Sequence, residues 1–379
     1  MLLKLIQIRN IFGASSENMI MKNGLYLLTL LLLSSFCTKA QIPLSDSTSA
    51  KPYIPPLFSI ANKNGISLNN SLINDDVFTL FTHGYVLEKA RRPVFVNEEK
   101  QMIDGTYWRT NSELNYGRLF TIFGGILAVD MIAYLYQVDV WYKEPTREFH
   151  TVRFVKDMQS WQFMDKIGHF TDAYFVSDLT SKLYRWAGVS GYSSVWYGAL
   201  TGFLWTLQIE ISDGFMRGWG WSWGDMIFNT LGSGFFVLQQ YFYDELGGIQ
   251  PKVSWHKSDA WKEDRYYRTI TAPIEDYEGI TFWLSVNPHH YFPKSWKKSY
   301  PEWLAPLGVA VGYSAKEVAS NIRGGYHEVF IGLDLDLRKI PIGNDSGLFR
   351  FIKSELNFLR LPMPTVRVYP SGIWYGFYF

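Results

Sequence analysis

The sequence has little cysteine, few charged residues and no long uninterrupted apolar run. Its single cysteine, Cys37, follows the bulky Phe36, whereas a lipidation signal has a small residue there. Cys37 also precedes the cleavage site inferred below, so the mature chain is expected to contain no disulfide bond, zinc–thiolate site or cysteine nucleophile. Charged residues make up 19% of the chain and the net charge is +1, which indicates no basic surface for nucleic acid.

No segment reaches the roughly 18 consecutive apolar residues expected of a clear membrane span. Four shorter apolar segments, each of helical length, are interrupted by polar residues. They predict a four-helix bundle at residues 118–245, either embedded in a membrane with a polar interior or buried within protein. The segments begin at Leu119, at Phe163, at Val195 and after the Gly/Trp-rich stretch 217–224, and the last ends near Tyr243.

Aromatic residues are abundant instead, at 17% of the chain. Trp and Tyr are enriched at boundaries between apolar and aqueous phases, because each combines an apolar ring with a polar tip. This composition favours a protein that is associated with a membrane.

Residues 21–40 have the composition of a secretory signal peptide. Lys22 supplies a positive charge, an apolar stretch follows it, and residues 38–40 form a cleavage site of the small-x-small type. Cleavage would leave Gln41 as the mature N-terminus. Residues 1–20 are then expected to be an upstream extension.

The remaining regions predict an irregular segment, a linker and a small sheet. Residues 41–117 are rich in Ser, Pro and Asn and are expected to be irregular, whereas the charged and aromatic residues 246–272 resemble a surface linker. Residues 273–379 contain strand-like alternation, so the predicted fold is α+β, a helical bundle followed by a small antiparallel sheet. Four strands are expected at 280–287, 308–314, 328–337 and 366–379, with one helix at 348–356.

The chain ends on an aromatic pattern of period two, formed by Ile373, Tyr375, Phe377 and Phe379. This ending resembles the C-terminal signature that outer-membrane insertion machinery recognises, which predicts association with the outer membrane. A last strand that buries one aromatic face against the bundle would give the same pattern, so both interpretations stay open.

Polar residues at helical spacing within the apolar segments define the candidate site. The last three segments each carry a polar pair three or four positions apart, which places the pair on one helix face. Apolar helices carry such groups mainly where they pair with one another or take part in chemistry, so we expect them to converge. The candidates are Asp165, Lys166 and His169 in the second segment, Glu210 and Asp213 in the third, and Asp225 and Asn229 in the fourth.

One interpretation of these residues is chemical. A carboxylate one turn from an imidazole can orient it and raise its pKa, so His169 is a candidate catalytic acid–base group together with Glu210 and Asp213. The candidate binding residues are Asp165, Lys166, Asp225 and Asn229.

The other interpretation is structural, with buried ion pairs that join the helices. Asp225 in particular fits a capping box with Ser222, in which both satisfy free amides at the start of the last helix. A hard or borderline ion could bind to Asp165, His169, Glu210 and Asp213, but one imidazole and no thiol make a metal the weaker expectation. We therefore predict no metal and no cofactor.

The three motifs resemble the YfiM-like family, a domain of unknown function in predicted periplasmic or outer-membrane proteins of Gram-negative bacteria. The resemblance rests on Asp-Lys-x-x-His-Phe at 165–170, an acidic pair before Gly-Phe at 210–215, and Ser-x-x-Asp-x-x-x-Asn-x-x-Gly at 222–232. Segments 275–287 and 301–314 are similar to longer Bacteroidetes forms, and a more distant similarity runs to VanZ-like membrane proteins. The resemblance implies an envelope location and implies no particular reaction.

Three functions fit the sequence. The first is an exported envelope protein, at the outer membrane or in the periplasm, that is a structural component at a membrane or binds a membrane lipid, an envelope glycan or a protein partner there. The second is an envelope enzyme that acts on a lipid-linked or cell-wall substrate through His169, Glu210 and Asp213. The third is a soluble periplasmic protein whose aromatic residues bind a partner. No nucleic-acid partner is expected in any of these cases.

Overall fold

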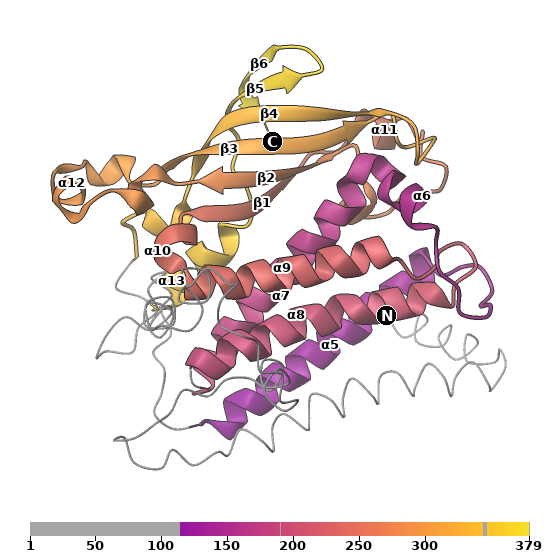
Figure 1. Cartoon of the computed structure of the whole chain (residues 1–379), viewed down its shortest axis with the longest axis horizontal. Coiled ribbons are helices and arrows are strands. Elements are labelled where there is room, and N and C mark those ends of the chain that lie inside the picture. Colours follow the sequence, from indigo (N-terminus) through magenta and orange to yellow (C-terminus); the bar gives the residue numbers. More distant parts are fainter. Residues whose placement is uncertain (1–113, 190, 344–346, 379) are drawn as a thin grey trace, which may run out of the picture. The chain divides into compact units, whose positions relative to one another are not determined.

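The computed structural model describes residues 114–378, except residues 190 and 344–346. These residues all belong to the unit Glu88–Phe379. The predicted upstream extension, the signal peptide and nearly all of the irregular segment lie outside the described residues. The described part combines helices with one antiparallel sheet, which confirms the α+β class (Figure 1).

Helices form at all four positions predicted from the apolar segments. Two of them begin at a residue that caps the helix: Asn115 accepts a hydrogen bond from the backbone N–H of Arg118, and Ser222 accepts one from that of Asp225. The four helices are α5 (Tyr116–Val140), α7 (Met164–Trp186), α8 (Gly191–Gly214) and α9 (Trp223–Tyr241).

A tight turn joins α6 (Phe154–Met158) to α7, through η3 (Ser160–Phe163). Trp161, Gln162 and Phe163 have φ angles of 55°, 51° and 70°, in the left-handed region that L-residues rarely adopt. Tertiary contacts hold this turn, because the Trp161 ring is buried and the Gln162 amide donates to a backbone carbonyl at 2.8 Å. The turn allows α6 to approach the side of α7 and α9.

Helix α9 packs closely on α7 because a glycine lies at the contact. A Cβ atom at Gly232 would clash with the backbone carbonyl of Phe170. The missing side chain therefore lets the two helix backbones approach closely. The glycines of α5 have no such role, since Cβ atoms at Gly124 and Gly125 would meet nothing within 4 Å among the described residues.

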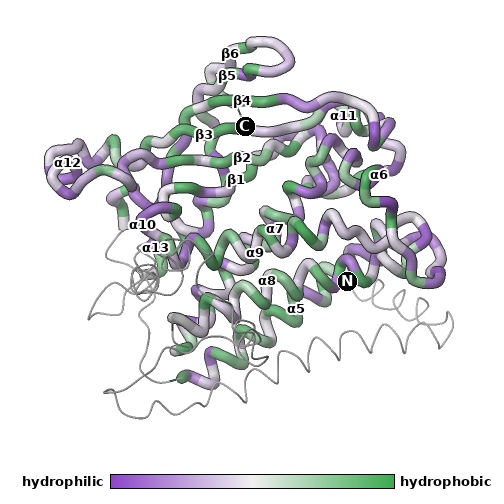
Figure 2. Tube along the Cα trace, viewed as in Figure 1, coloured by the Kyte–Doolittle hydropathy of each residue, from purple (hydrophilic) through white to green (hydrophobic). Residues whose placement is uncertain are grey.

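Among the described residues, α5 is the one helix long and apolar enough to cross a membrane (Figure 2). Only 17% of its most apolar window is buried. A hydrogen bond of 2.9 Å from Arg118 to the carbonyl of Trp186 joins it to α7, and the Gln208 amide of α8 donates to Asp130.

The sheet contains six strands, whereas four were predicted. Residues 249–255, expected in a linker, form the first strand, and the expected last strand is a hairpin of two. All neighbours are antiparallel and follow sequence order. The strands are β1 (Ile249–Trp255), β2 (Ile280–Val286), β3 (Leu307–Lys316), β4 (Tyr326–Leu335), β5 (Met363–Tyr369) and β6 (Ile373–Tyr378).

The first strand escaped prediction because its inward side chains are polar. Gln250, Lys252 and Ser254 alternate on one face and are all buried. Strand prediction expects apolar residues on the buried face, so this alternation resembles that of a surface segment.

The other described elements are short, except for α13, which confirms the helix expected at 348–356. They are α10 (Tyr243–Leu246), α11 (Asp259–Lys262), η4 (Pro273–Glu275), η5 (Pro288–Tyr291), α12 (Lys294–Ser299), η6 (Glu302–Leu304), η7 (Leu337–Lys339) and α13 (Gly347–Leu356).

One face of the sheet, here called the polar face, buries charged groups. The Lys252 ammonium lies 2.6 Å from the Asp334 carboxylate, and both side chains are 1% exposed. The guanidinium of Arg360 lies 3.8 Å above the ring of Trp283. Aromatic rings and paired charges together fill this face.

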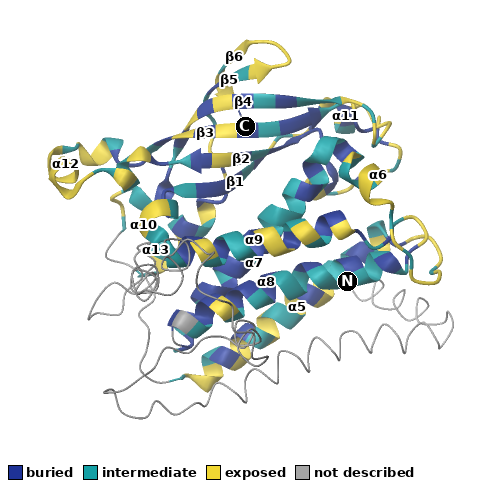
Figure 3. Ribbon diagram, in the orientation of Figure 1, coloured by how far each residue is buried: buried dark blue, intermediate teal, exposed yellow. Residues whose placement is uncertain are grey.

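The opposite face, here called the apolar face, is only partly covered by the described residues. Near one end, Phe282 approaches Gly168 of α7. Farther along, Leu284, Val311 and Ile331 are direct cross-strand neighbours and remain 49%, 51% and 47% exposed. Figure 3 shows how buried and exposed residues are distributed along the strands. Val366 and Trp374 continue this row across β5 and β6.

The last strand presents only part of its aromatic pattern outward. Ile373 and Phe377 are exposed, whereas Tyr375 packs with the buried Tyr378 on the ring of Phe330. Phe379 lies outside the described residues. The described part of this pattern therefore fits a surface strand better than a strand buried against the helices.

Candidate functional site

Lys166 lies at the centre of a group of buried ion pairs. It is on α7 and is completely buried. Its ammonium lies 2.8 Å from Asp157 of α6 and 2.9 Å from Asp165 of α7. A third carboxylate, that of Asp225 on α9, is 2.7 Å away. Because a buried ammonium must be paired, these contacts hold α6, α7 and α9 together.

The start of α9 is tied to the same group. The Ser222 hydroxyl donates to Asp157 at 2.6 Å, and the Ser222 backbone N–H donates to Glu210 of α8 at 3.1 Å. Ser222 is the N-cap, as predicted, but the Asp225 side chain turns to Lys166 rather than back to the cap. The expected capping box is therefore only half formed, because the ammonium attracts the carboxylate more strongly than a backbone amide does.

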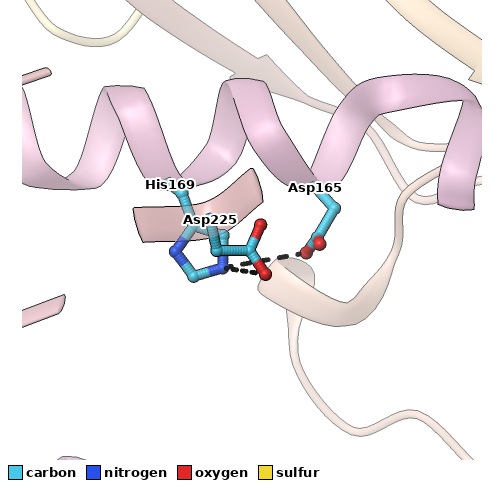
Figure 4. A group of neighbouring side chains, drawn as sticks. All are labelled: Asp165, His169 and Asp225. Carbon is cyan, nitrogen blue, oxygen red and sulfur yellow. Dashed lines mark ion pairs between the residues drawn. The ribbon is translucent and has the colours of Figure 1, made fainter. Parts of the chain in front are cut away.

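His169 lies one turn beyond Asp165 and faces three carboxylates. Its Nδ1 is 3.0 Å from the side-chain oxygen of Asn229 on α9. Its Nε2 lies 4.0 Å from Asp165 and 3.7 Å from Asp225 (Figure 4). The third carboxylate, that of Glu210, is 3.6 Å from Nε2. The predicted convergence of His169 with residues of all three helices is thus observed.

Glu210 is the least satisfied member of the group. It is completely buried, and one of its oxygens, Oε2, accepts the bond from Ser222. Its Oε1 accepts no hydrogen bond and points toward His169. A buried carboxylate oxygen without a donor is costly, so a positive charge is needed beside it.

Asp213 has a partner of its own. It accepts a hydrogen bond of 2.6 Å from the hydroxyl of Tyr142, in the segment between α5 and α6. Sequence spacing pairs it with Glu210 on one face of α8, but the structure directs Glu210 to His169 and Asp213 to Tyr142. Asp172, one turn after His169, accepts a bond of 3.1 Å from the Trp205 indole.

Burial and neighbouring charge shift the pKa values at this site strongly. Burial lowers the pKa of His169, but Asp225, Asp165 and Glu210 together raise it to about 9. Burial raises the pKa of Glu210 to about 9, although His169 opposes this rise. Burial likewise raises the pKa of Asp225.

Asp165 and Lys166 keep their charges. Burial would raise the pKa of Asp165, but Lys166 and His169 hold it at about 2. Burial would lower the pKa of Lys166, but Asp165, Asp225 and Asp157 raise it instead. The site therefore combines a permanent ion pair with an imidazole and carboxyl groups that can exchange protons.

This arrangement has two chemical capacities. A carboxyl group with a raised pKa beside an imidazole is the type of pair that performs acid–base chemistry near neutral pH. Several oxygens directed at one imidazole nitrogen can also surround a cation. The side chains of His169 and Asp165 are 17% and 22% exposed, so a substrate or an ion can reach the site.

Three members of the site escaped the sequence analysis, and one of them is Tyr142, the partner of Asp213. Asp157 lies on a separate short helix, so no helical period relates it to Lys166. The Tyr277 hydroxyl donates to Asp165 at 2.9 Å across 112 residues of sequence. Its place within "EDYEG" offers no chemical signal, since tyrosine is common throughout this chain.

Comparison with known proteins finds one family. Residues 155–241 match the family described as predicted periplasmic lipoprotein (DUF2279). This range covers most of α6 and all of α7, α8 and α9, and it includes every member of the site except Tyr142 and Tyr277. The match supports the expected resemblance to a periplasmic family without an established activity. No curated protein and no solved structure matches the chain.

Proposed function

We propose that this protein is exported to the cell envelope and binds a membrane there. In this proposal the buried ion pairs are structural and hold the helices together. The expected signal peptide and the similarity to predicted periplasmic lipoproteins support the location. The finer resemblances to YfiM-like and VanZ-like proteins, and the four-helix bundle with α5 as its outer member, belong to the same proposal.

The main support for membrane binding is that the sheet buries its polar face and exposes its apolar face. An antiparallel sheet in water normally turns its polar face outward. Here the polar face is buried and contains Lys252 and Asp334, whereas Leu284, Val311 and Ile331 form an exposed apolar row. Contiguous exposed apolar surface of this kind marks a site for a membrane or a protein partner.

The helices add further apolar surface. Helix α5 is apolar and little buried. Helix α9 exposes an apolar stripe, because residues four or seven positions apart share one helix face. The stripe consists of Trp223, Ile227, Leu231 and Leu238. Since the net charge is only +1, attraction to a membrane would be apolar rather than electrostatic.

Flotation of vesicles tests this proposal. The chain beginning at Gln41 is mixed with phosphatidylethanolamine–phosphatidylglycerol vesicles and centrifuged through a density gradient. We expect the protein to float with the vesicles, and high salt to leave the bound fraction unchanged because screening affects only charges.

Two lysine variants provide the matched comparison. Ile331→Lys places a charge in the exposed apolar row, whereas Ile342→Lys places one at an exposed apolar residue outside the strands. We expect the bound fraction to fall by about half or more with Ile331→Lys only, since charge is costly in an apolar phase. Wild-type protein that stays at the bottom of the gradient, or equal losses in both variants, would contradict the proposal.

A second candidate function is an envelope enzyme that acts on a lipid-linked or cell-wall substrate. The observation in its favour is the unpaired Oε1 of Glu210 beside the partly accessible His169. The variant His169→Gln separates the two functions. A lower melting temperature supports the structural role, whereas unchanged stability with lost cellular function supports the enzyme.

A further inference from the structure

Three carboxylates share one pattern of contacts around His169. Each uses one oxygen for a fixed partner and directs its other oxygen at Nε2, although the directed oxygen of Asp165 also accepts a hydrogen bond of 2.9 Å from the Tyr277 hydroxyl. Asp165 and Asp225 both use the fixed oxygen to bind Lys166, and Glu210 uses its own to accept from Ser222. The three remaining oxygens, Oδ1 of Asp165, Oδ2 of Asp225 and Oε1 of Glu210, are therefore held in place around the imidazole.

The spacing of these atoms is wider than that of hydrogen bonds. The three distances from Nε2 are 3.6, 3.7 and 4.0 Å, whereas a charge-assisted N–H···O bond measures about 2.7–2.9 Å. Ligands bound at about 2.1 Å to one tetrahedral ion lie roughly 3.4 Å from one another. The ligand atoms of Asp165, His169 and Asp225 all lie within 4.8 Å of one another, so a modest contraction would bring these three to one ion. Glu210 would join them as a fourth ligand by a further shift of its side chain toward Nε2, from which its Oε1 lies 3.6 Å.

Asn229 sets the orientation of the imidazole. Its side-chain oxygen lies 3.0 Å from Nδ1, so Nδ1–H donates to it and Nε2 is directed at the carboxylates. A second residue that fixes the tautomer in this way is a regular companion of histidines that bind metals.

The local charge favours a divalent ion. With the imidazole neutral and the carboxylates ionised, the three candidate ligands carry three negative charges, and the single ammonium beside them is shared with a fourth carboxylate, that of Asp157. Oε1 of Glu210 is completely buried, lacks any hydrogen-bond donor and points into this space. Lys166 does not fill the space, because it binds the opposite oxygens of Asp165 and Asp225.

We propose that Asp165, His169, Glu210 and Asp225 form a binding site for one divalent metal ion. This assignment differs from the prediction made from sequence, which counted histidines and thiols and could not see that three carboxylate oxygens meet at one nitrogen. One imidazole with three carboxylates suits Zn²⁺ or Mn²⁺ better than Mg²⁺ or Ca²⁺, which prefer ligand sets made only of oxygens.

Titration calorimetry with metal-free protein tests the site. The chain beginning at Gln41 is treated with EDTA, dialysed and titrated separately with Zn²⁺ and Mn²⁺. We expect one ion per chain with micromolar or tighter affinity, a higher melting temperature on binding, and no competition from equimolar Mg²⁺ or Ca²⁺.

Two variants locate the ion. Glu210→Gln keeps the shape of the side chain but removes a charged ligand, and we expect it to weaken binding by about 100-fold. Asp172→Asn removes a carboxylate one turn from His169 that is bonded to Trp205, and its affinity should stay within about threefold of wild type. Equal losses in both variants would show charge attraction without a defined site.

The wild-type protein gives an independent test if Glu210→Gln does not fold. Mn²⁺ bound at the four residues should broaden the NMR signals of the His169 ring, whereas an ion elsewhere should leave them sharp. Absence of binding at micromolar Zn²⁺ and Mn²⁺ would overturn the proposal, and a proton on His169 would then be the charge that compensates the carboxylates.

Discussion

Single side chains in this protein bring charge into places that water does not reach. Lys252 and Asp334 do so in the sheet, and Lys182 pairs with Glu355 at 2.8 Å between α7 and α13. Lys166 is the extreme case, since three carboxylates surround it. Removal of one partner from a buried pair costs about 3–5 kcal/mol because the other charge is left uncompensated.

The variant Lys166→Met tests this cost. We expect the free energy of unfolding to fall by about 3–5 kcal/mol, since the buried Asp225 and the partly buried Asp157 and Asp165 lose their common ammonium. Lys262→Met is the control, because the pair of Lys262 with Asp259 is exposed and should contribute less than about 1 kcal/mol. Urea denaturation at neutral pH measures both values. Equal stability of the two variants would mean that the carboxylates are compensated in another way.

Asp336 predicts a dependence of stability on pH. Burial would raise its pKa, but two contacts of 2.9 Å with the Arg338 guanidinium hold the pKa below its usual range. A carboxyl group with a lower pKa in the folded state adds stability that is complete above its unfolded pKa, near 4, and is lost as the pH falls through the folded value.

The variant Asp336→Asn should therefore cost more stability near neutral pH than in acid. Urea denaturation of wild type and variant at a series of pH values measures the difference. A difference that stays constant down to acid pH would show that the ion pair with Arg338 contributes nothing to stability.

At the scale of elements, the sequence predicted helices better than strands. The four long helices follow apolar segments whose period matches a helix, and Ser222 marked the start of α9 correctly. β1 was missed because Lys252 lies on its buried face. Helical spacing located the residues of the site, but it could not assign the contacts of Asp213 with Tyr142, because tertiary pairing is absent from any local pattern.

Alanine substitutions at two glycines of α9 distinguish the effect of close packing on stability from the effect of helix propensity. Gly232→Ala should lower stability by about 2 kcal/mol or more, because the new methyl group meets the carbonyl of Phe170 and overpacks the contact. Gly234→Ala should be neutral or stabilising by up to about 1 kcal/mol, since nothing lies within 4 Å and alanine favours helix. Thermal unfolding of both variants checks this, and equal effects would contradict the packing of α9 on α7.

At the scale of the whole molecule, polar contacts join the helices to the segments around the sheet. Tyr277, before β2, binds Asp165 of α7. Glu275 accepts hydrogen bonds of 3.0 Å from Tyr136 and 3.2 Å from the Trp141 indole. Unfolding of either the helices or the sheet would therefore break these contacts and destabilise the other region.

We expect the helices and the sheet to unfold together for this reason. Far-ultraviolet circular dichroism, which reports mainly the helices, and tryptophan fluorescence should give coincident transitions in urea. Separate midpoints would show that the two regions fold independently and that the contacts of Glu275 and Tyr277 are weak.

The mature N-terminus tests the envelope location. The signal at residues 21–40 predicts that the exported protein begins at Gln41, and mass spectrometry of protein from the native envelope measures this directly. An intact Met1 or Met21 would contradict export. A lipid-modified Cys37 would contradict the inferred cleavage site and agree with the lipoprotein description of the matching family.

The order of the strands also has a consequence for the speed of folding. Each strand pairs with its neighbour in sequence, and short connections join β3 to β4 and β5 to β6, so these two hairpins can form without closing long loops. The charged site needs partners as far apart as Asp165 and Tyr277, which are separated by 112 residues. We expect the hairpins to form early and the charged site to close late, when loop-closure entropy can be offset by packing that already exists.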